Sequence, residues 1–249
     1  MIVRNRKLVA ILAALVVTLT AQALAQAPQV KRPLEKLLKP RPLLRVPESV
    51  ILEQDIEYGR AGQRSLRLDI LRPKKPNRSP LPVVVFVHGG AWRAGNKSAG
   101  IGILAPLAAT GDFFCATVGY RLTGEAIWPA QIHDCKAAIR YLRANAQRLG
   151  IDPERIAVWG SSAGGHLVCL LGTSGDVKEL EGDSGSPGHS SRVACVVDFC
   201  GPTDFLACAK FKRTALPPPA AAESPESLLL GGPIQQRREQ AIAASPVTY

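Results

Sequence analysis

The sequence has little of what metal, redox and nucleic-acid chemistry require. Its six cysteines include no C-x-x-C pair, so their spacing indicates neither a zinc site nor a thioredoxin-like redox site. Residues 31–48 are strongly basic, with six Lys or Arg against two Glu, but no aromatic residue is interleaved among them. Because single-stranded nucleic acid is held by stacking its bases on aromatic side chains, a nucleic-acid partner is not indicated. No internal repeat is visible.

The first 25 residues predict a secretory signal peptide. Residues 1–7 are cationic without an acidic residue, an apolar run follows to about Leu19, and the small residues Ala23 and Ala25 suit signal peptidase. An uncleaved membrane anchor is the alternative, but the apolar run is short for a membrane span. We therefore expect a secreted or periplasmic protein with no stable membrane anchor after cleavage.

Export also makes disulfides an option for the six cysteines, although their pairing cannot be derived from the sequence. Three of them lie inside apolar runs, where a cysteine often packs as a small hydrophobic residue: Cys115, Cys169 and Cys195.

Residues 26–47 predict a basic, proline-rich linker, and residues 48–249 predict one α/β domain. With 46% hydrophobic and 20% charged residues, the chain has the composition of a domain with a sizeable core. Period-two alternation predicts a half-buried strand at 64–73, and 50–59 is also strand-like. Continuous apolar runs predict four strands buried on both faces, at 81–90, 112–122, 155–160 and 191–202.

Between these runs, apolar residues recur at helical spacing from Pro129 to Leu149, and the Gly/Ser-rich segment 173–191 is typical of a surface loop. Alternation of helices with fully apolar strands predicts a mainly parallel sheet covered by helices on both faces.

The segment VWGSSAGGH (158–166) contains the one serine that fits G-x-S-x-G, Ser162, with Gly160 and Gly164 on either side. In such a motif a strand turns sharply into a helix so that the serine is exposed, and the flanking positions come too close for a side chain. Ser161 does not fit, because Trp159 and Ala163 occupy the corresponding positions. An apolar strand before the motif and a helix-like segment after it support a nucleophilic serine. The alternative is a glycine-rich turn without chemistry.

The second motif, HGGAW (88–92), directly follows a predicted buried strand. Acyl transfer needs N–H donors aimed at the oxyanion of the tetrahedral intermediate. We expect these donors to be the amides of Gly90 and Ala91 together with that of Ala163, the residue after the nucleophile. Gly89 lets the backbone approach the substrate, and His88 is expected to stabilise the loop rather than to act as a base.

Three segments follow one another along the chain: HGGAW, GYRL (119–122) and the run 128–167. With these segments in this order, the sequence resembles the α/β-hydrolase fold esterases of the hormone-sensitive-lipase-like group. Within that group it is similar to secreted bacterial acetyl-xylan and feruloyl esterases. The resemblance implies an ester hydrolase without metal or cofactor, acting through an acyl-enzyme on Ser162. Small-molecule or polysaccharide esters are the implied substrates. Ala91 stands where lipase-type members commonly have a third glycine, and alanine keeps the amide donor.

In this family a histidine and an acid that follow the serine complete the triad. After Ser162 the chain offers His166, in the helix of the nucleophile, and His189, in the Gly/Ser-rich segment. Asp198 and Asp204 are the candidate catalytic acids, although capping a loop or turn is the simpler role for both. We therefore expect the catalytic acid and histidine to lie beyond Tyr249, which makes the domain incomplete at its C-terminus.

Two other functions remain open at this point. A kynurenine-formamidase-like amide hydrolase also uses an H-G-G-x-W loop, although export argues against an intracellular substrate. A non-catalytic binding protein with the α/β-hydrolase fold is the alternative from another class.

Overall fold

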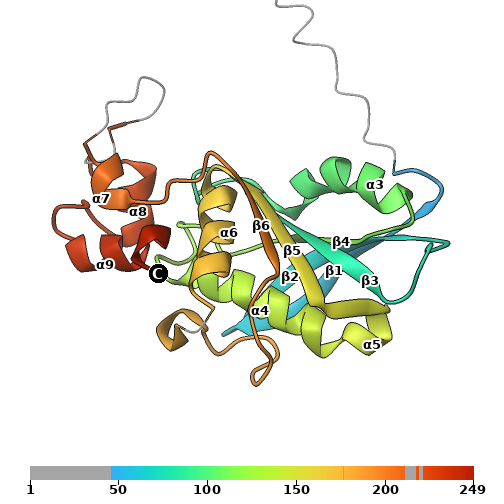
Figure 1. Cartoon of the computed structure of the whole chain (residues 1–249). Helices are drawn as coiled ribbons and strands as arrows, with labels where there is room; N and C mark the ends of the chain where they lie inside the picture. The colour runs from blue at the N-terminus through green and yellow to red at the C-terminus, as the bar shows by residue number, and fades with distance from the viewer. Residues whose placement is uncertain (1–45, 176, 211–216, 219–220) are drawn as a thin grey trace, which may run out of the picture. The chain divides into compact units, whose positions relative to one another are not determined.

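The computed structural model describes residues 46–175, 177–210, 217–218 and 221–249 (Figure 1). The predicted signal peptide and all but the last two residues of the predicted linker lie outside this range. Among the described residues, no helix has the length and apolar character that crossing a membrane requires.

The described part of the chain is built on a six-stranded mixed sheet with the order β1-β2-β4-β3-β5-β6. β1 pairs antiparallel with β2, and β2 pairs antiparallel with β4, whereas the three remaining pairings are parallel. The predicted mainly parallel sheet is therefore confirmed. The strands are β1 (Val50–Ala61), β2 (Arg64–Pro73), β3 (Leu81–Val87), β4 (Phe114–Val118), β5 (Ile151–Ser161) and β6 (Cys195–Phe199).

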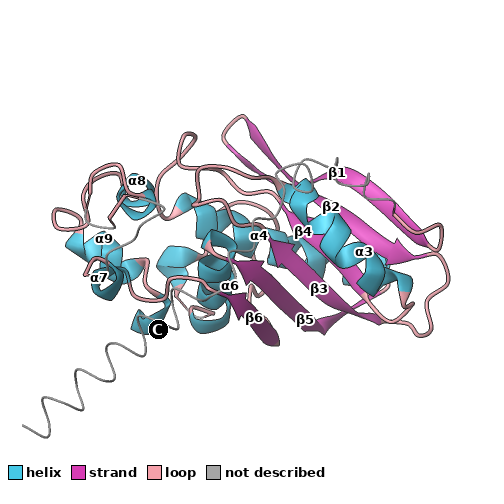
Figure 2. Cartoon of the chain, turned by 90° about the horizontal axis from the view of Figure 1, so that it is seen from above, coloured by secondary structure: helices cyan, strands magenta, loops and turns pink. Residues whose placement is uncertain are grey.

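Helices cover both faces of the sheet, as the apolar strands predict (Figure 2). The short helix η1 (Lys97–Gly100) leads into α3 (Ile101–Ala109), which packs on β2 and β4. On the other face lie α4 (Ala130–Ala144) and α6 (Ala163–Thr173).

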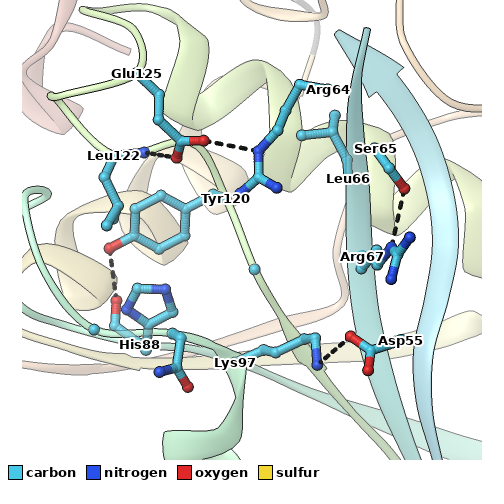
Figure 3. A pocket seen from close by; sticks show the side chains of 13 residues that line it. Asp55, Arg64, Ser65, Leu66, Arg67, His88, Lys97, Tyr120, Leu122 and Glu125 are labelled. Carbon is cyan, nitrogen blue, oxygen red and sulfur yellow. Dashed lines mark hydrogen bonds and ion pairs between the residues drawn. The ribbon is translucent and has the colours of Figure 1, made fainter.

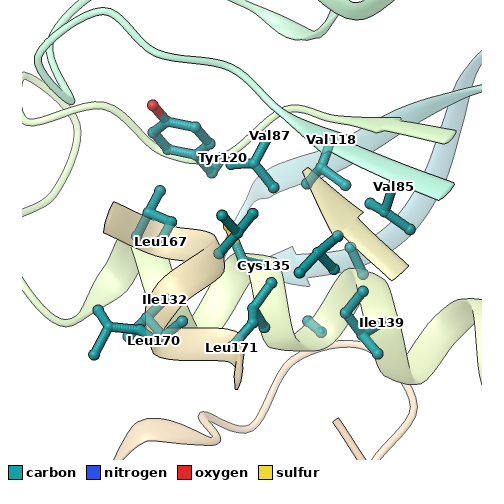
Figure 4. Close-up of a cluster of buried hydrophobic side chains, with 14 of the residues drawn as sticks. Val85, Val87, Val118, Tyr120, Ile132, Cys135, Ile139, Leu167, Leu170 and Leu171 are labelled. Carbon is teal, nitrogen blue, oxygen red and sulfur yellow. The ribbon is translucent and has the colours of Figure 1, made fainter. Parts of the chain in front are cut away.

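Alternate side chains of β3 enter the two cores. Val85 and Val87 point toward α4 and α6 (Figure 4), whereas Phe86 belongs to the cluster beneath α3.

The helix predicted over Pro129–Leu149 is broken at Asn145 into α4 and α5 (Ala146–Leu149). Asn145 leaves the helical region with φ −103 and ψ 14, and its side-chain amide donates to the carbonyl of Tyr141. Gly150 then ends α5 in the left-handed region, at φ 66. The predicted apolar stripe is confirmed, because Ile132, Cys135, Ile139 and Leu142 are buried.

Two strands differ from the prediction in how far their faces are buried. β2 was expected to be half-buried, but Asp69 and Leu71 on its other face are also buried, since η1 and α3 lie over them. β6 was expected to be buried on both faces, yet Val197 is 41% exposed and Phe199 51% exposed. Among the described residues β6 pairs with β5 alone, which places it at the edge of the sheet. The cysteines follow the same pattern: Cys115 is buried, Cys169 half-buried and Cys195 exposed, and all three are free thiols.

The remaining helices of the described chain are short. η2 (Lys178–Leu180) lies in the segment expected to be a loop. α7 (Phe205–Cys208), α8 (Pro225–Leu230), α9 (Arg238–Ala243) and η3 (Pro246–Thr248) follow β6. In Figure 2, α7, α8 and α9 gather on the side of α6 that faces away from the sheet.

Candidate active site

Ser162 occupies the turn between β5 and α6. Its backbone has φ 55 and ψ −121, its amide donates to the carbonyl of Phe199 at 2.8 Å, and its side chain is exposed. Non-glycine residues seldom adopt a positive φ, and those that do concentrate at functional sites. Ser161, in contrast, is still part of β5. The structure therefore shows at Ser162 the strand-to-helix turn that the G-x-S-x-G spacing predicts.

The glycines of the motif are required by close packing. A side chain at Gly160 would collide with the carbonyl of Gly164, and a side chain at Gly164 would collide with the carbonyl of Val87 at the end of β3. The two glycines thus let α6 approach both the strand that precedes it, β5, and the neighbouring strand β3.

Residues 88–97, called here the oxyanion loop because its amides are the expected oxyanion donors, pass directly beside Ser162. A Cβ on Gly89 would lie 3.4 Å from the Cβ of Ser162. The next three residues all have a positive φ: 116 at Gly90, 55 at Ala91 and 56 at Trp92. Between described residues, no hydrogen bond uses the amide N–H of Gly90, Ala91 or Ala163. These three N–H groups therefore have no hydrogen-bond partner in the described part of the chain.

His88 is held inside the loop. Its ring stacks on Tyr120 with centroids 4.3 Å apart, and its Nδ1 lies 2.7 Å from the carbonyl oxygen of Gly89. The Tyr120 hydroxyl donates to the His88 carbonyl at 2.9 Å. Burial lowers the pKa of His88, so the ring favours its neutral form. These contacts fit a structural role.

His166 is fully buried in α6, the helix that begins directly after Ser162. Its Nδ1 lies 3.1 Å from the indole Nε1 of Trp92, and its Nε2 lies 2.7 Å from the carbonyl oxygen of Ala244. Burial lowers its pKa to about 4. Both ring nitrogens are thus engaged away from Ser162.

The other candidates for the triad, His189, Asp198 and Asp204, have no side-chain hydrogen bond to the Ser162 hydroxyl in the described part of the chain. His189 belongs to the surface segment before β6, and the remaining histidine, His133, has its Nε2 3.0 Å from the carbonyl oxygen of Glu179. Asp198 accepts from the amide of Gly201, and Asp204 caps α7. All four histidines of the chain are described, and none has a ring nitrogen hydrogen-bonded to the hydroxyl of Ser162.

A polar cavity of about 310 Å³ lies between β2, the oxyanion loop and the segment after β4 (Figure 3). Arg64 pairs with Glu125 at 2.7 Å, while Lys97 pairs with Asp55 at 3.0 Å and with the buried Asp69 at 2.7 Å. Ser162 is not among the residues that line the cavity. No group of metal-binding side chains is found among the described residues.

Sequence reasoning missed the pairing of Trp92 with His166. Both residues stood within the two motifs, as the last residue of HGGAW and the last of VWGSSAGGH. Their meeting depends on the position of α6 beside β3, which neither motif predicts alone.

The family model of BD-FAE matches residues 68–249. Esterase LipC of Mycobacterium tuberculosis is 38% identical over 139 residues, covering 55% of this chain and 34% of the relative. The probable carboxylic ester hydrolase LipM of the same organism is 30% identical over 211 residues, covering 84% of this chain and 47% of the relative. The chain thus spans less than half the length of these curated relatives.

Among solved structures, a truncated carbohydrate esterase from gut microbiota superposes with a TM-score of 0.70 at 32% identity, covering 80% of this chain and 72% of the other. Esterase B from Lactobacillus rhamnosis, 21% identical with a TM-score of 0.65, shares the fold. The strand order, the turn at Ser162 and these matches agree: the chain belongs to the BD-FAE family and has the α/β-hydrolase fold of the hormone-sensitive-lipase-like esterases.

Proposed function

We propose that this protein is a carboxylic ester hydrolase that acts through an acyl-enzyme on Ser162. The observation that carries the proposal is the exposed Ser162, held at φ 55 directly beside Gly89 of the oxyanion loop. A hydroxyl in this place can attack an ester carbonyl while backbone amides receive the negative charge that develops on the carbonyl oxygen. The esterases among the relatives support the same chemistry.

The reaction has two halves. Ser162 Oγ adds to the ester carbonyl, and the amides of Gly90, Ala91 and Ala163 stabilise the oxyanion of the tetrahedral intermediate. Collapse of the intermediate expels the alcohol and leaves an acyl group on Ser162, which water then removes through a second tetrahedral intermediate. No metal or other cofactor takes part in these steps. In a complete triad a histidine would carry the proton from Ser162 to the leaving alcohol.

For the substrate we propose acyl esters of polysaccharides, outside the cytoplasm. The 32% identical carbohydrate esterase supports the substrate class, and the predicted signal peptide supports secretion. We expect the protein to hydrolyse these esters after signal cleavage, either as a secreted or as a periplasmic protein.

A non-catalytic binding protein is the second candidate. The observation that favours it is that none of the four histidine rings is hydrogen-bonded to the hydroxyl of Ser162. A serine without a base is a weak nucleophile, and such a protein would keep the fold and lose turnover.

A panel of p-nitrophenyl esters from acetyl to decanoyl, with a feruloyl ester alongside, tests the proposal. We expect Ser162→Ala to remove the turnover of the chain and Ser161→Ala, its matched control, to preserve it. In complete triads the loss of the nucleophile costs on the order of 10⁶ in kcat. We expect a smaller loss here and a wild-type kcat below about 1 s⁻¹, because no histidine ring is hydrogen-bonded to the hydroxyl of Ser162.

Two other results would be decisive. A wild type no faster than Ser162→Ala on every ester would favour the binding protein. Equal losses from both serine variants would mean that Ser162 is not the nucleophile.

A further inference from the structure

We propose that Trp92 and His166 form a positioning pair that holds the oxyanion loop in register with the nucleophile helix. This role rests on the proposed ester hydrolysis. Neither side chain touches the reacting atoms in this account. Together they set where the amides of Gly90 and Ala91 lie relative to Ser162.

The pair is buried and its hydrogen bond has a defined direction. Trp92 is 2% exposed and His166 is 0% exposed, and their rings meet edge to face with centroids 5.2 Å apart. An indole N–H can only donate, so Nδ1 of His166 must be the acceptor and carries no proton. The ring proton therefore resides on Nε2, which donates to the carbonyl of Ala244 at 2.7 Å. Two partners on opposite sides of the ring select one tautomer and one orientation.

The oxyanion loop needs an anchor because its backbone is strained. Ala91 and Trp92, at φ 55 and 56, both lie in the left-handed region that side chains disfavour. Gly90 and Ala91 lie between Gly89, whose backbone runs close beside Ser162, and Trp92, which is bonded to His166. The carbonyl of Trp92 also accepts from the amide of Thr123 at 2.9 Å. The two donor amides lie between these fixed points.

His166 connects the loop to the helix that begins at the third donor. It is a residue of α6, which starts at Ala163 directly after the nucleophile. A bond from Trp92 to His166 therefore puts all three oxyanion donors in one rigid frame. The Ala244 contact ties the segment after α9 to the same frame.

The surroundings of His166 keep it a neutral acceptor. The rings in contact with it are those of Trp92, Trp128 and Phe205, none of which titrates. Its pKa, lowered to about 4 by burial, leaves Nδ1 unprotonated throughout the neutral range. The hydrogen bond to Trp92 therefore persists at any pH where the esterase would be assayed.

Trp92→Phe tests the pair, because it removes the N–H while keeping an aromatic ring in place. Trp128→Phe is the matched control: Trp128 is also buried and its ring lies 6.1 Å from that of His166, but its indole N–H makes no hydrogen bond with a described residue. We expect Trp92→Phe to lower kcat on an acetyl ester about 10- to 100-fold with KM nearly unchanged, because misplaced donors weaken transition-state binding. We expect Trp128→Phe to stay within about twofold of wild type.

A second measurement separates positioning from activity. Amide hydrogen exchange by NMR, at matched folded fractions, should be about 10-fold faster in Trp92→Phe than in Trp128→Phe at Arg93 and Ala94, whose amides donate to the carbonyl of Gly90 within the loop. If both variants show the same exchange and the same kcat, the pair is a packing contact and the inference is wrong. If the wild type hydrolyses no ester, the proposed function fails instead, and the exchange rates alone decide whether Trp92 holds the loop.

Discussion

Ser162 is one of several residues around the site with an unfavourable backbone. The described chain has five non-glycine residues with positive φ, and four of them are Ala91, Trp92, Ser162 and Cys200, the last next to the Phe199 carbonyl that accepts from Ser162. Each such conformation costs about 1–3 kcal/mol and persists where the surroundings over-determine it. At φ 55, Ala91 also excludes proline, whose ring requires a φ near about −65°. A proline there would disturb the loop as well as remove one donor.

The neutrality of His166 makes stability depend on pH. Its pKa is lowered from 6.5 to about 4 by burial, so between these values the unfolded chain binds a proton that the folded chain does not. This linkage leaves the free energy of unfolding nearly unaffected above pH 6.5 and lowers it by on the order of 2 kcal/mol at pH 5. We expect urea unfolding at pH 7 and pH 5 to show a smaller loss for His166→Gln than for wild type.

The exposed His189 provides the control for this measurement, since His189→Gln should lose as much stability between the two pH values as wild type. Buried His88 is unsuitable as a control because its pKa is lowered in the same direction. An unchanged pH dependence in His166→Gln would show that His166 is not the neutral buried group described here.

At the scale of elements, periodicity predicted the strands well and their environment less well. β3 carries side chains to both cores, as a continuous apolar run predicts. β6 has the same kind of sequence but lies at an edge, and β2 alternates as a half-exposed strand but is covered by α3. A strand's own residues indicate which conformation it favours. They do not indicate which neighbour will pack against it, because that depends on segments far away in the chain.

The exposed edge of β6 leads to a prediction about association. Unpaired, β-branched edge strands with little charge recruit other chains. We expect residues 26–249 to self-associate in sedimentation velocity at micromolar concentration, and Val197→Lys to shift the protein toward monomer. Val247, 64% exposed in η3 and outside the sheet, supplies the control substitution Val247→Lys. If both lysine variants behave as the wild type does, or if both reduce association equally, the edge of β6 is not the contact.

For the whole molecule, local motifs predicted the fold and the strand-to-helix turn at Ser162 because their reasons are steric and local. The glycines around Ser162 and the loop after β3 are such cases. The partners of His166 could not be predicted in this way. One is 74 residues earlier in the sequence and the other 78 residues later, and they meet only after the sheet has formed. The same limit applies to the proton acceptor that the proposed reaction requires, which no spacing in the sequence identifies.

The central claim is that Ser162 is the nucleophile of an acyl-transfer site. Incubating the protein to completion with a fluorophosphonate probe, followed by peptide mapping, tests it most directly, because the probe forms a covalent bond with a serine whose surroundings stabilise an oxyanion. The account predicts an adduct on Ser162, none on Ser161 beside it, and no adduct in Ser162→Ala. An unmodified Ser162, or an adduct on Ser161, would contradict it.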